Sequence, residues 1–170
     1  MNTLYIITGP AGVGKSTISR AIAESLPKSA VIEGDDIYNQ VVGGYILPWL
    51  EGNHLDVMWK IVFDSIKTYI ESGFDVVLNY IINPEQLSML KKAFLDVTIR
   101  FAVLTVDEKT LLARDSERPL DCQMGERCLD LLREMKAYNY GYDCYLDSTH
   151  LTIPETVSKI TADDRFVVSC

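Results

Sequence analysis

Residues 9–16 read Gly-Pro-Ala-Gly-Val-Gly-Lys-Ser and match the pattern GxxxxGK[ST] at every fixed position. The motif follows an apolar, strand-like run at residues 4–8 and precedes a helix-like run at residues 15–26. Its glycines let the backbone turn tightly, so that backbone N–H groups and the helix N-terminus point at phosphate oxygens. The motif therefore predicts a nucleoside triphosphate site formed by Gly9, Pro10, Ala11, Gly12, Val13, Gly14, Lys15, Ser16 and Thr17.

Two side chains of this motif carry specific expected roles. Lys15 would reach the β- and γ-phosphates, and the hydroxyl of Ser16 would ligate Mg²⁺. The chain contains no Asn/Thr-Lys-x-Asp guanine motif, which favours ATP over GTP. We therefore expect ATP and Mg²⁺ as cofactors.

Composition excludes several classes of protein. The 170 residues are 48% hydrophobic and 24% charged, which is ordinary for one globular domain, expected here over residues 1–170. The net charge of −8 disfavours broad nucleic-acid binding or a polybasic membrane surface. No secretory signal, membrane-length apolar run or CxxC pair is visible, so we expect a cytoplasmic protein, monomeric or homodimeric, with reduced cysteines.

Apolar, β-branched runs alternate with longer helical patterns. The expected strands are residues 3–8, 30–34, 75–80, 98–105 and 144–147, and the expected helices are residues 15–25, 54–72, 84–94, 108–117, 125–139 and 154–161. This alternation predicts an α/β fold with a parallel sheet covered on both faces, which places ligands at the carboxyl ends of the strands. Residues 38–53 should form a loop or short helix, within a region at about 38–60 that would face a phosphoryl acceptor.

The second expected strand ends in acidic residues, Glu33-Gly34-Asp35-Asp36. A kinase that acts on a hydroxyl needs a base near the triphosphate to take the proton as the phosphoryl group transfers. Asp35 is the candidate base, and Asp36 is a candidate for substrate or Mg²⁺ contact. The alternative for both is a helix N-cap or an Asx turn, which aspartate also favours.

The third expected strand is hydrophobic and resembles the strand that usually ends in the Walker B aspartate. Here that position is Asn79, which can orient a magnesium-bound water but brings no charge. Mg²⁺ would then depend on Ser16, the nucleotide phosphates and Asp35. The substitution leaves open whether catalysis is fast.

Four of the seven arginines fall within residues 114–133. Arg114 and Arg118 are four residues apart, so on a helix they share one face, with Leu111 and Leu112 expected to pack inward. Guanidinium groups suit phosphoryl oxygens, so a lid at about residues 108–126 would close over the transferring group. The alternative is a solvated helix face on which Asp115 and Glu117 pair with the arginines.

Aromatic residues follow the acidic strand end. Tyr45 and Trp49 are expected to line the acceptor side of the cleft, although aromatic residues there can equally be core residues. For Trp59, inside an expected helix, the core is the favoured interpretation.

Taken together, these residues resemble the P-loop small-molecule kinases of the nucleoside-monophosphate-kinase-like fold. This group includes gluconate, shikimate and zeta-toxin-type kinases and chloramphenicol phosphotransferase, and the chain looks most similar to bacterial gluconate-kinase-like proteins. The resemblance rests on residues 9–16, Gly34-Asp35, the arginine-bearing residues 111–118 and Asp147-Ser148-Thr149, and implies a five-stranded parallel sheet in the order 2-3-1-4-5. The His-Pro stretch of gluconate kinase after its Gly-Asp is absent, as is its Asp-Arg pair before Pro-Trp-Leu.

The expected function is therefore transfer of the γ-phosphoryl group of ATP to a hydroxyl of a small molecule. The expected partner is that acceptor, with no nucleic acid and no membrane. The alternative is a nucleotide-binding sensor or slow NTPase without an acceptor, which Asn79 favours.

Overall fold

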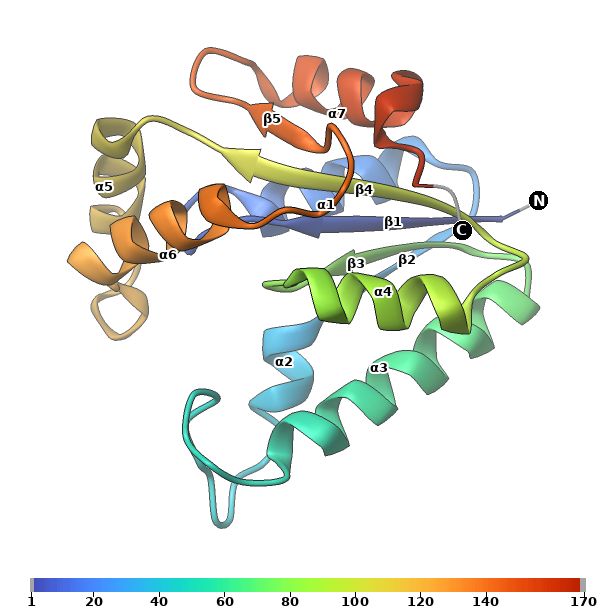
Figure 1. Cartoon of the computed structure of the whole chain (residues 1–170), viewed down its shortest axis with the longest axis horizontal. Coiled ribbons are helices and arrows are strands. Elements are labelled where there is room, and N and C mark those ends of the chain that lie inside the picture. The colour runs from blue at the N-terminus through green and yellow to red at the C-terminus, as the bar shows by residue number, and fades with distance from the viewer. Residues whose placement is uncertain (1, 169–170) are drawn as a thin grey trace.

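The structure is a computed structural model that describes residues 2–168 (Figure 1). Its five strands form one parallel sheet in the order β2-β3-β1-β4-β5, which confirms the expected fold class and strand order. The strands are β1 (Thr3–Thr8), β2 (Ser29–Glu33), β3 (Asp75–Asn79), β4 (Thr98–Thr105) and β5 (Tyr145–Asp147).

Seven α-helices are present among the described residues. They are α1 (Lys15–Ser25), α2 (Gly34–Tyr38), α3 (His54–Glu71), α4 (Pro84–Ala93), α5 (Glu108–Ser116), α6 (Glu126–Ala137) and α7 (Ile153–Ala162), with short 3₁₀ turns at Leu120–Cys122 and Asp164–Phe166. Six were predicted, with boundaries within two residues of those observed. The prediction missed α2, because five residues are too few to show a helical period, and it wrongly extended the second strand to Gly34.

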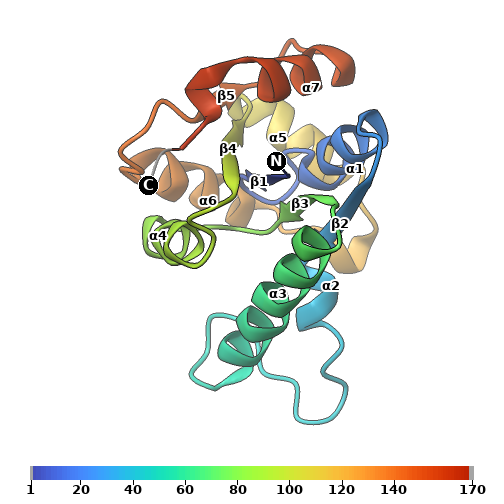
Figure 2. The same ribbon diagram turned by 90° about the vertical axis from the view of Figure 1, so that its right-hand side faces the viewer.

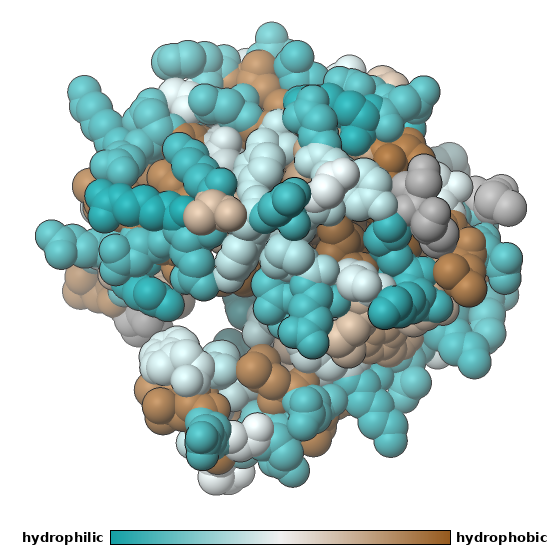
Figure 3. Space-filling view, viewed as in Figure 1, coloured by the Kyte–Doolittle hydropathy of each residue, from teal (hydrophilic) through white to brown (hydrophobic). Residues whose placement is uncertain are grey.

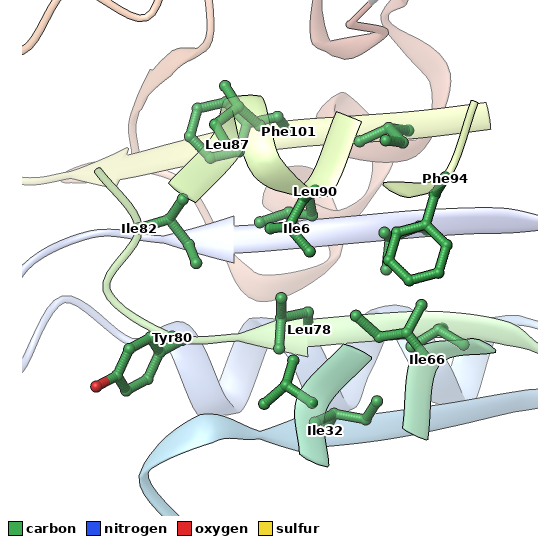
Figure 4. Packing of buried hydrophobic residues seen from close by; sticks show 14 of the residues in the cluster. Ile6, Ile32, Ile66, Leu78, Tyr80, Ile82, Leu87, Leu90, Phe94 and Phe101 are labelled. Atoms are coloured by element: carbon green, nitrogen blue, oxygen red, sulfur yellow. The ribbon is translucent and has the colours of Figure 1, made fainter. Parts of the chain in front are cut away.

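Two apolar layers sandwich the sheet, because alternate residues of each strand point to opposite faces. Leu4 and Ile6 of β1 belong to the layer under α3 and α4, whereas Tyr5 and Ile7 belong to the layer under α1 and α7 (Figure 2). Figure 4 shows the first layer, in which Leu78 of β3 lies between β1 and the helix α3. Both faces of the sheet are thus covered, as the near-continuous apolar strands predicted.

Local sequence signals explain where several helices begin. Asn83 caps α4 and Thr152 caps α7, each in a reciprocal capping box with the residue three positions later. By contrast, α1 begins after Gly14 with no side-chain cap. The first N–H groups of α1 therefore have no capping partner from a side chain and remain available to a ligand.

The segment between α2 and α3 projects from the body of the molecule beside the carboxyl ends of the strands (Figure 1). Val42 is 92% exposed and Trp49 is 68% exposed, so apolar side chains of this segment face solvent. Trp59 is buried in the core layer under α3, as the core interpretation predicted. Across residues 2–168, none of the helices is both long enough and apolar enough to cross a bilayer.

Candidate active site

The loop that connects β1 to α1 has the backbone that a phosphate cradle needs. The φ angles of Gly9, Gly12 and Gly14 are 146°, 79° and 106°. Residues other than glycine rarely adopt this region of backbone conformation. At Gly9 a Cβ atom would lie 2.5 Å from the carbonyl oxygen of Leu104 on β4. The loop is therefore tied closely to the sheet, and it leads directly into the uncapped N-terminus of α1.

Lys15 lies at the start of α1, with its ammonium nitrogen Nζ donating to the carbonyl oxygen of Pro10 at 3.1 Å. Loss of hydration in the protein lowers the pKa of Lys15 to about 8, and the nearby Arg118 adds to this effect. The carboxylates of Asp35 and Glu33 oppose it. A bound triphosphate would stabilise the charged form of Lys15, because the negative charge of the phosphates compensates for the lost hydration.

Glu33, Asn79 and Ser16 form a polar cluster at the foot of the cradle. In the parallel sheet Glu33 of β2 lies directly beside Asn79 of β3, which in turn lies beside Ile7 of β1. The amide nitrogen of Asn79 donates to the Glu33 carboxylate and, at 2.9 Å, to the hydroxyl of Ser16. That hydroxyl donates to Glu33 at 3.3 Å. Glu33 thus places a negative charge beside the expected magnesium ligand.

The oxygen atoms of this cluster fit a magnesium ion. The carbonyl oxygen Oδ1 of Asn79 is buried and has no hydrogen-bond partner, while its amide nitrogen is held by Glu33 and Ser16. Mg²⁺ prefers oxygen ligands and is usually held by one or two protein groups plus substrate phosphates. Among the described residues no group of three or more His, Cys, Asp or Glu side chains suits a metal ion. Any magnesium would therefore depend on the nucleotide as well as on Ser16 and Glu33.

Asp35 and Asp36 occupy the first turn of α2, directly after the tip of β2. Both side chains are exposed, but Asp35 lines the central cavity and Asp36 is not among the described residues that do so. This position favours Asp35, which the sequence indicates as the base, and gives no support to a substrate contact by Asp36.

The lid carries its arginines on and beside α5. The guanidinium of Arg114 donates to the carbonyl oxygen of Val13 in the phosphate loop at 3.0 Å, so the lid helix touches the cradle directly. Arg118 follows the end of α5 and pairs with Asp115 at 3.2 Å. Leu111 is fully buried, but Leu112 is 39% exposed, so the expectation that both leucines pack inward is wrong for Leu112. Consecutive side chains of a helix point in different directions, and in α5 that of Leu112 points toward solvent.

Asp115 holds the lid together. The residue is 2% exposed, and its carboxylate accepts hydrogen bonds from the backbone N–H groups of Met124 and Gly125 at 2.9 and 2.8 Å, in addition to the pair with Arg118. Burial raises the pKa of Asp115, but these three donors outweigh it and the net pKa is lowered. The sequence suggested Asp115 only as a partner on a solvated face, whereas it is a buried anchor between α5 and α6.

One cavity of about 1020 Å³ joins these parts at the carboxyl ends of the strands. Figure 3 shows the surface hollowed between the lid helices and the projecting α2–α3 segment. The lining includes Ala11, Gly12, Val13, Gly14, Lys15, Ser16, Thr17, Asp35, Trp49, Asn79, Tyr80, Arg114, Arg118 and Arg127. Nucleotide-sized and acceptor-sized molecules both fall within the capacity of such a cavity.

Some predicted residues lie outside this lining. Gly9 packs against the backbone of Leu104, and the carbonyl oxygen of Pro10 accepts from Lys15. Tyr45 packs edge-on against Tyr38 with 5.7 Å between ring centroids. Trp49 does line the cavity. Two lining or neighbouring residues, Glu33 and Tyr80, had not been selected from the sequence. The signal that could have found Glu33 is its place at the last position of β2, in register with Asn79.

Comparison with protein families gives a match over residues 6–135 to the family described as AAA domain. The chain belongs to this AAA domain family. The matched range runs from β1 through the lid to α6 and so includes every part of the phosphate site described above. No curated protein matches the chain significantly.

Solved structures share the fold of this AAA domain at low sequence identity. The tunicamycin resistance protein of Deinococcus radiodurans has a TM-score of 0.71 at 18% identity, with 100% of this chain and 99% of that chain covered. A gluconokinase from Sinorhizobium meliloti 1021 has a TM-score of 0.67 at 19% identity over 95% and 90% of the two chains. A sugar kinase from Janibacter sp. HTCC2649 has a TM-score of 0.67 at 13% identity over 98% and 94%. The predicted P-loop small-molecule kinase fold is thereby confirmed.

Proposed function

We propose that this chain is an ATP-dependent phosphotransferase that moves the γ-phosphoryl group to a hydroxyl of a small molecule. The observation that carries the proposal is the single cavity in which Lys15, Ser16, Asp35, Arg114 and Arg118 meet. A nucleotide-binding cradle alone would not need a lined space beyond the phosphate loop. Here Asp35 and Trp49 extend the cavity to the side of β2 and β3.

The role proposed for each residue in binding or catalysis follows from its position in the cavity. The amides of the phosphate loop and the N-terminus of α1 bind the phosphate oxygens, and Lys15 binds the β- and γ-phosphates. Arg114 and Arg118 reach the same region from the lid and neutralise charge that develops on the transferring group. Asp35, exposed to the cavity, accepts the proton of the acceptor hydroxyl.

Ser16 and Glu33 would hold Mg²⁺ together with the nucleotide, Ser16 as a direct ligand and Glu33 through the charge beside it. When bound, the ion would neutralise the β- and γ-phosphate oxygens. Asn79 orients both protein groups by donating to each of them. In this arrangement the charge expected from a Walker B aspartate comes from the neighbouring strand.

The proposal is tested by ADP release from Mg-ATP across sugar acids, nucleosides, aminoglycosides and amphenicols. Stimulation by one compound, absent in Lys15→Ala, is the expected result. Asp35→Asn should keep ATP binding but lower acceptor-dependent turnover by on the order of 10²-fold. The matched control is Asp36→Asn, which changes a neighbouring carboxylate outside the described cavity lining.

Two results would contradict the proposal. Slow ADP release that depends on Lys15 but on no acceptor would favour a nucleotide-binding sensor or slow NTPase instead. Unchanged ATP affinity in Lys15→Ala would show that the cradle is not the nucleotide site.

A further inference from the structure

The side of the cavity next to β2 and β3 is lined mainly by apolar and aromatic side chains. Trp49 and Leu55 come from the α2–α3 segment and the start of α3, and Tyr80 and Ile81 directly follow β3. Tyr138, after α6, packs against the same core layer as Tyr80. Because β3 and β5 lie on opposite sides of β1, this wall is separate from the part of the lining that follows β5, which includes Ser148 and Leu151.

Tyr80 is fixed as part of this wall. Its ring meets the edge of Trp59 with 5.7 Å between centroids, and it lies so close to Gly34 that a Cβ there would be 2.5 Å from Tyr80 Cδ2. Figure 4 shows the hydroxyl pointing away from the apolar layer, at the end of β3. Burial, with a contribution from Asp35, raises the pKa of Tyr80, so the hydroxyl stays protonated beside the candidate base.

Polar groups on this wall are few and partly engaged. Asn83 and Gln86 line the cavity, but their side-chain oxygens are used in the capping box of α4. The oxygen of Asn83 accepts the backbone N–H of Gln86 at 2.8 Å, and the oxygen of Gln86 accepts the backbone N–H of Asn83 at 2.9 Å. A linear polyol needs a hydrogen-bond partner for each hydroxyl that it buries. An apolar ring needs none and gains from aromatic neighbours.

From this wall we infer that the acceptor is an alcohol that carries a flat, largely apolar ring, bound against Trp49 and Tyr80. The inference rests on the phosphotransferase function proposed above. In the reaction the acceptor oxygen forms a bond to the γ-phosphorus and the bond to the β–γ bridging oxygen breaks. The hydroxyl proton passes to Asp35, and ADP leaves.

Binding and turnover can be measured separately. The chain has two tryptophans, so Trp59→Phe leaves Trp49 as the single fluorescent reporter in the cavity. Benzyl alcohol and 2-phenylethanol serve as ring-bearing probes, and gluconate and sorbitol serve as ring-free probes. We expect the ring-bearing probes to change Trp49 fluorescence at concentrations at least tenfold lower, and at least one of them to stimulate ADP release.

A pair of variants tests the wall itself. Trp49→Ala should raise the KM for the ring-bearing acceptor by about tenfold and leave the KM for ATP unchanged. Val42→Ala is the matched control, because Val42 is a still more exposed residue of the same segment and is not among the described residues that line the cavity. Equal effects of the two variants would overturn the role of the wall.

The outcomes separate the two proposals. Ring-bearing probes that bind without releasing ADP would support the ligand class and contradict the phosphotransferase. Stimulation by gluconate or sorbitol, with no binding of ring-bearing probes, would support the phosphotransferase and overturn the ligand class. Neither binding nor stimulation by any probe would overturn both.

Discussion

Replacing Asp115 with alanine should release the lid. Asp115 is 2% exposed, and its carboxylate accepts hydrogen bonds from two backbone N–H groups, those of Met124 and Gly125. A hydrogen bond to a charged group contributes about 1.5–3 kcal/mol, so the two amides together account for about 3–6 kcal/mol. The pair with Arg118 adds little to this energy, because the arginine side chain is 35% exposed and solvent screens the interaction.

A loss of this size favours local opening over a folded lid with two unpaired amides. At about 1.4 kcal/mol per factor of ten, a loss of 3 kcal/mol corresponds to faster hydrogen exchange by on the order of 10²-fold. The amides of Met124 and Gly125 should show this change, while those of β1 keep their protection. Exchange measured residue by residue in the folded protein is the suitable assay.

Glu117→Ala is the matched control, because Glu117 is an exposed acidic residue at the end of the same helix. It should leave the exchange of both amides unchanged. If Asp115→Ala also left them protected, the carboxylate would not be the anchor of the lid and the reasoning would be refuted.

The same anchor has a pH dependence with a definite sign. The net pKa of Asp115 is lowered in the folded protein, so its contribution is fully present above the unfolded value of 3.8. It is lost as the pH falls through the lowered pKa. Lid protection should therefore hold at neutral pH and fail only in strong acid, and failure between pH 5 and 7 would contradict the assignment.

Three further results are expected. Glu33→Gln should raise the Mg²⁺ concentration needed for half-maximal ADP release by about 10–100-fold, because it removes the charge beside Ser16; an unchanged requirement would exclude Glu33 from the magnesium site. Gly34→Ala should displace the ring of Tyr80 and raise the acceptor KM without affecting ATP affinity measured by calorimetry, and a change confined to ATP would contradict this. In the protein without nucleotide the pKa of Lys15 is about 8, so ATP affinity should fall by up to about tenfold per pH unit above pH 8. The Lys15→Ala variant should lack this pH dependence.

The sequence predicted the elements whose signals are local. The phosphate loop carries its own glycines, and α1, α3 and α4 have apolar periods long enough to read. Strand order came from the resemblance and was confirmed by the pairing of β1 with β3 and β4.

The residues that sequence reasoning missed act through contacts between distant parts of the chain. Glu33 meets Asn79 across 46 positions, and only the register of β2 against β3 brings them together. Asp115 looked like one more charge on an exposed helix, since nothing in residues 108–118 reveals that the chain returns at Met124 and Gly125. Such partners depend on the fold and have no signature in a single sequence.

The pairing of Glu33 with Asn79 also explains why an amide is suitable at the Walker B position. Burial, together with Asp35 and Asp36, raises the pKa of Glu33, while hydrogen bonds from Ser16 and Asn79 favour its charged form. An aspartate at position 79 would place a second carboxylate beside Glu33 and remove a donor to it, so the two acids would compete for one proton. With the charge supplied from β2, a neutral donor on β3 stabilises it. Asn79 is therefore better understood as the hydrogen-bond partner of the Glu33 carboxylate on β2 than as the loss of a carboxylate from β3. Its presence alone is no argument against catalysis.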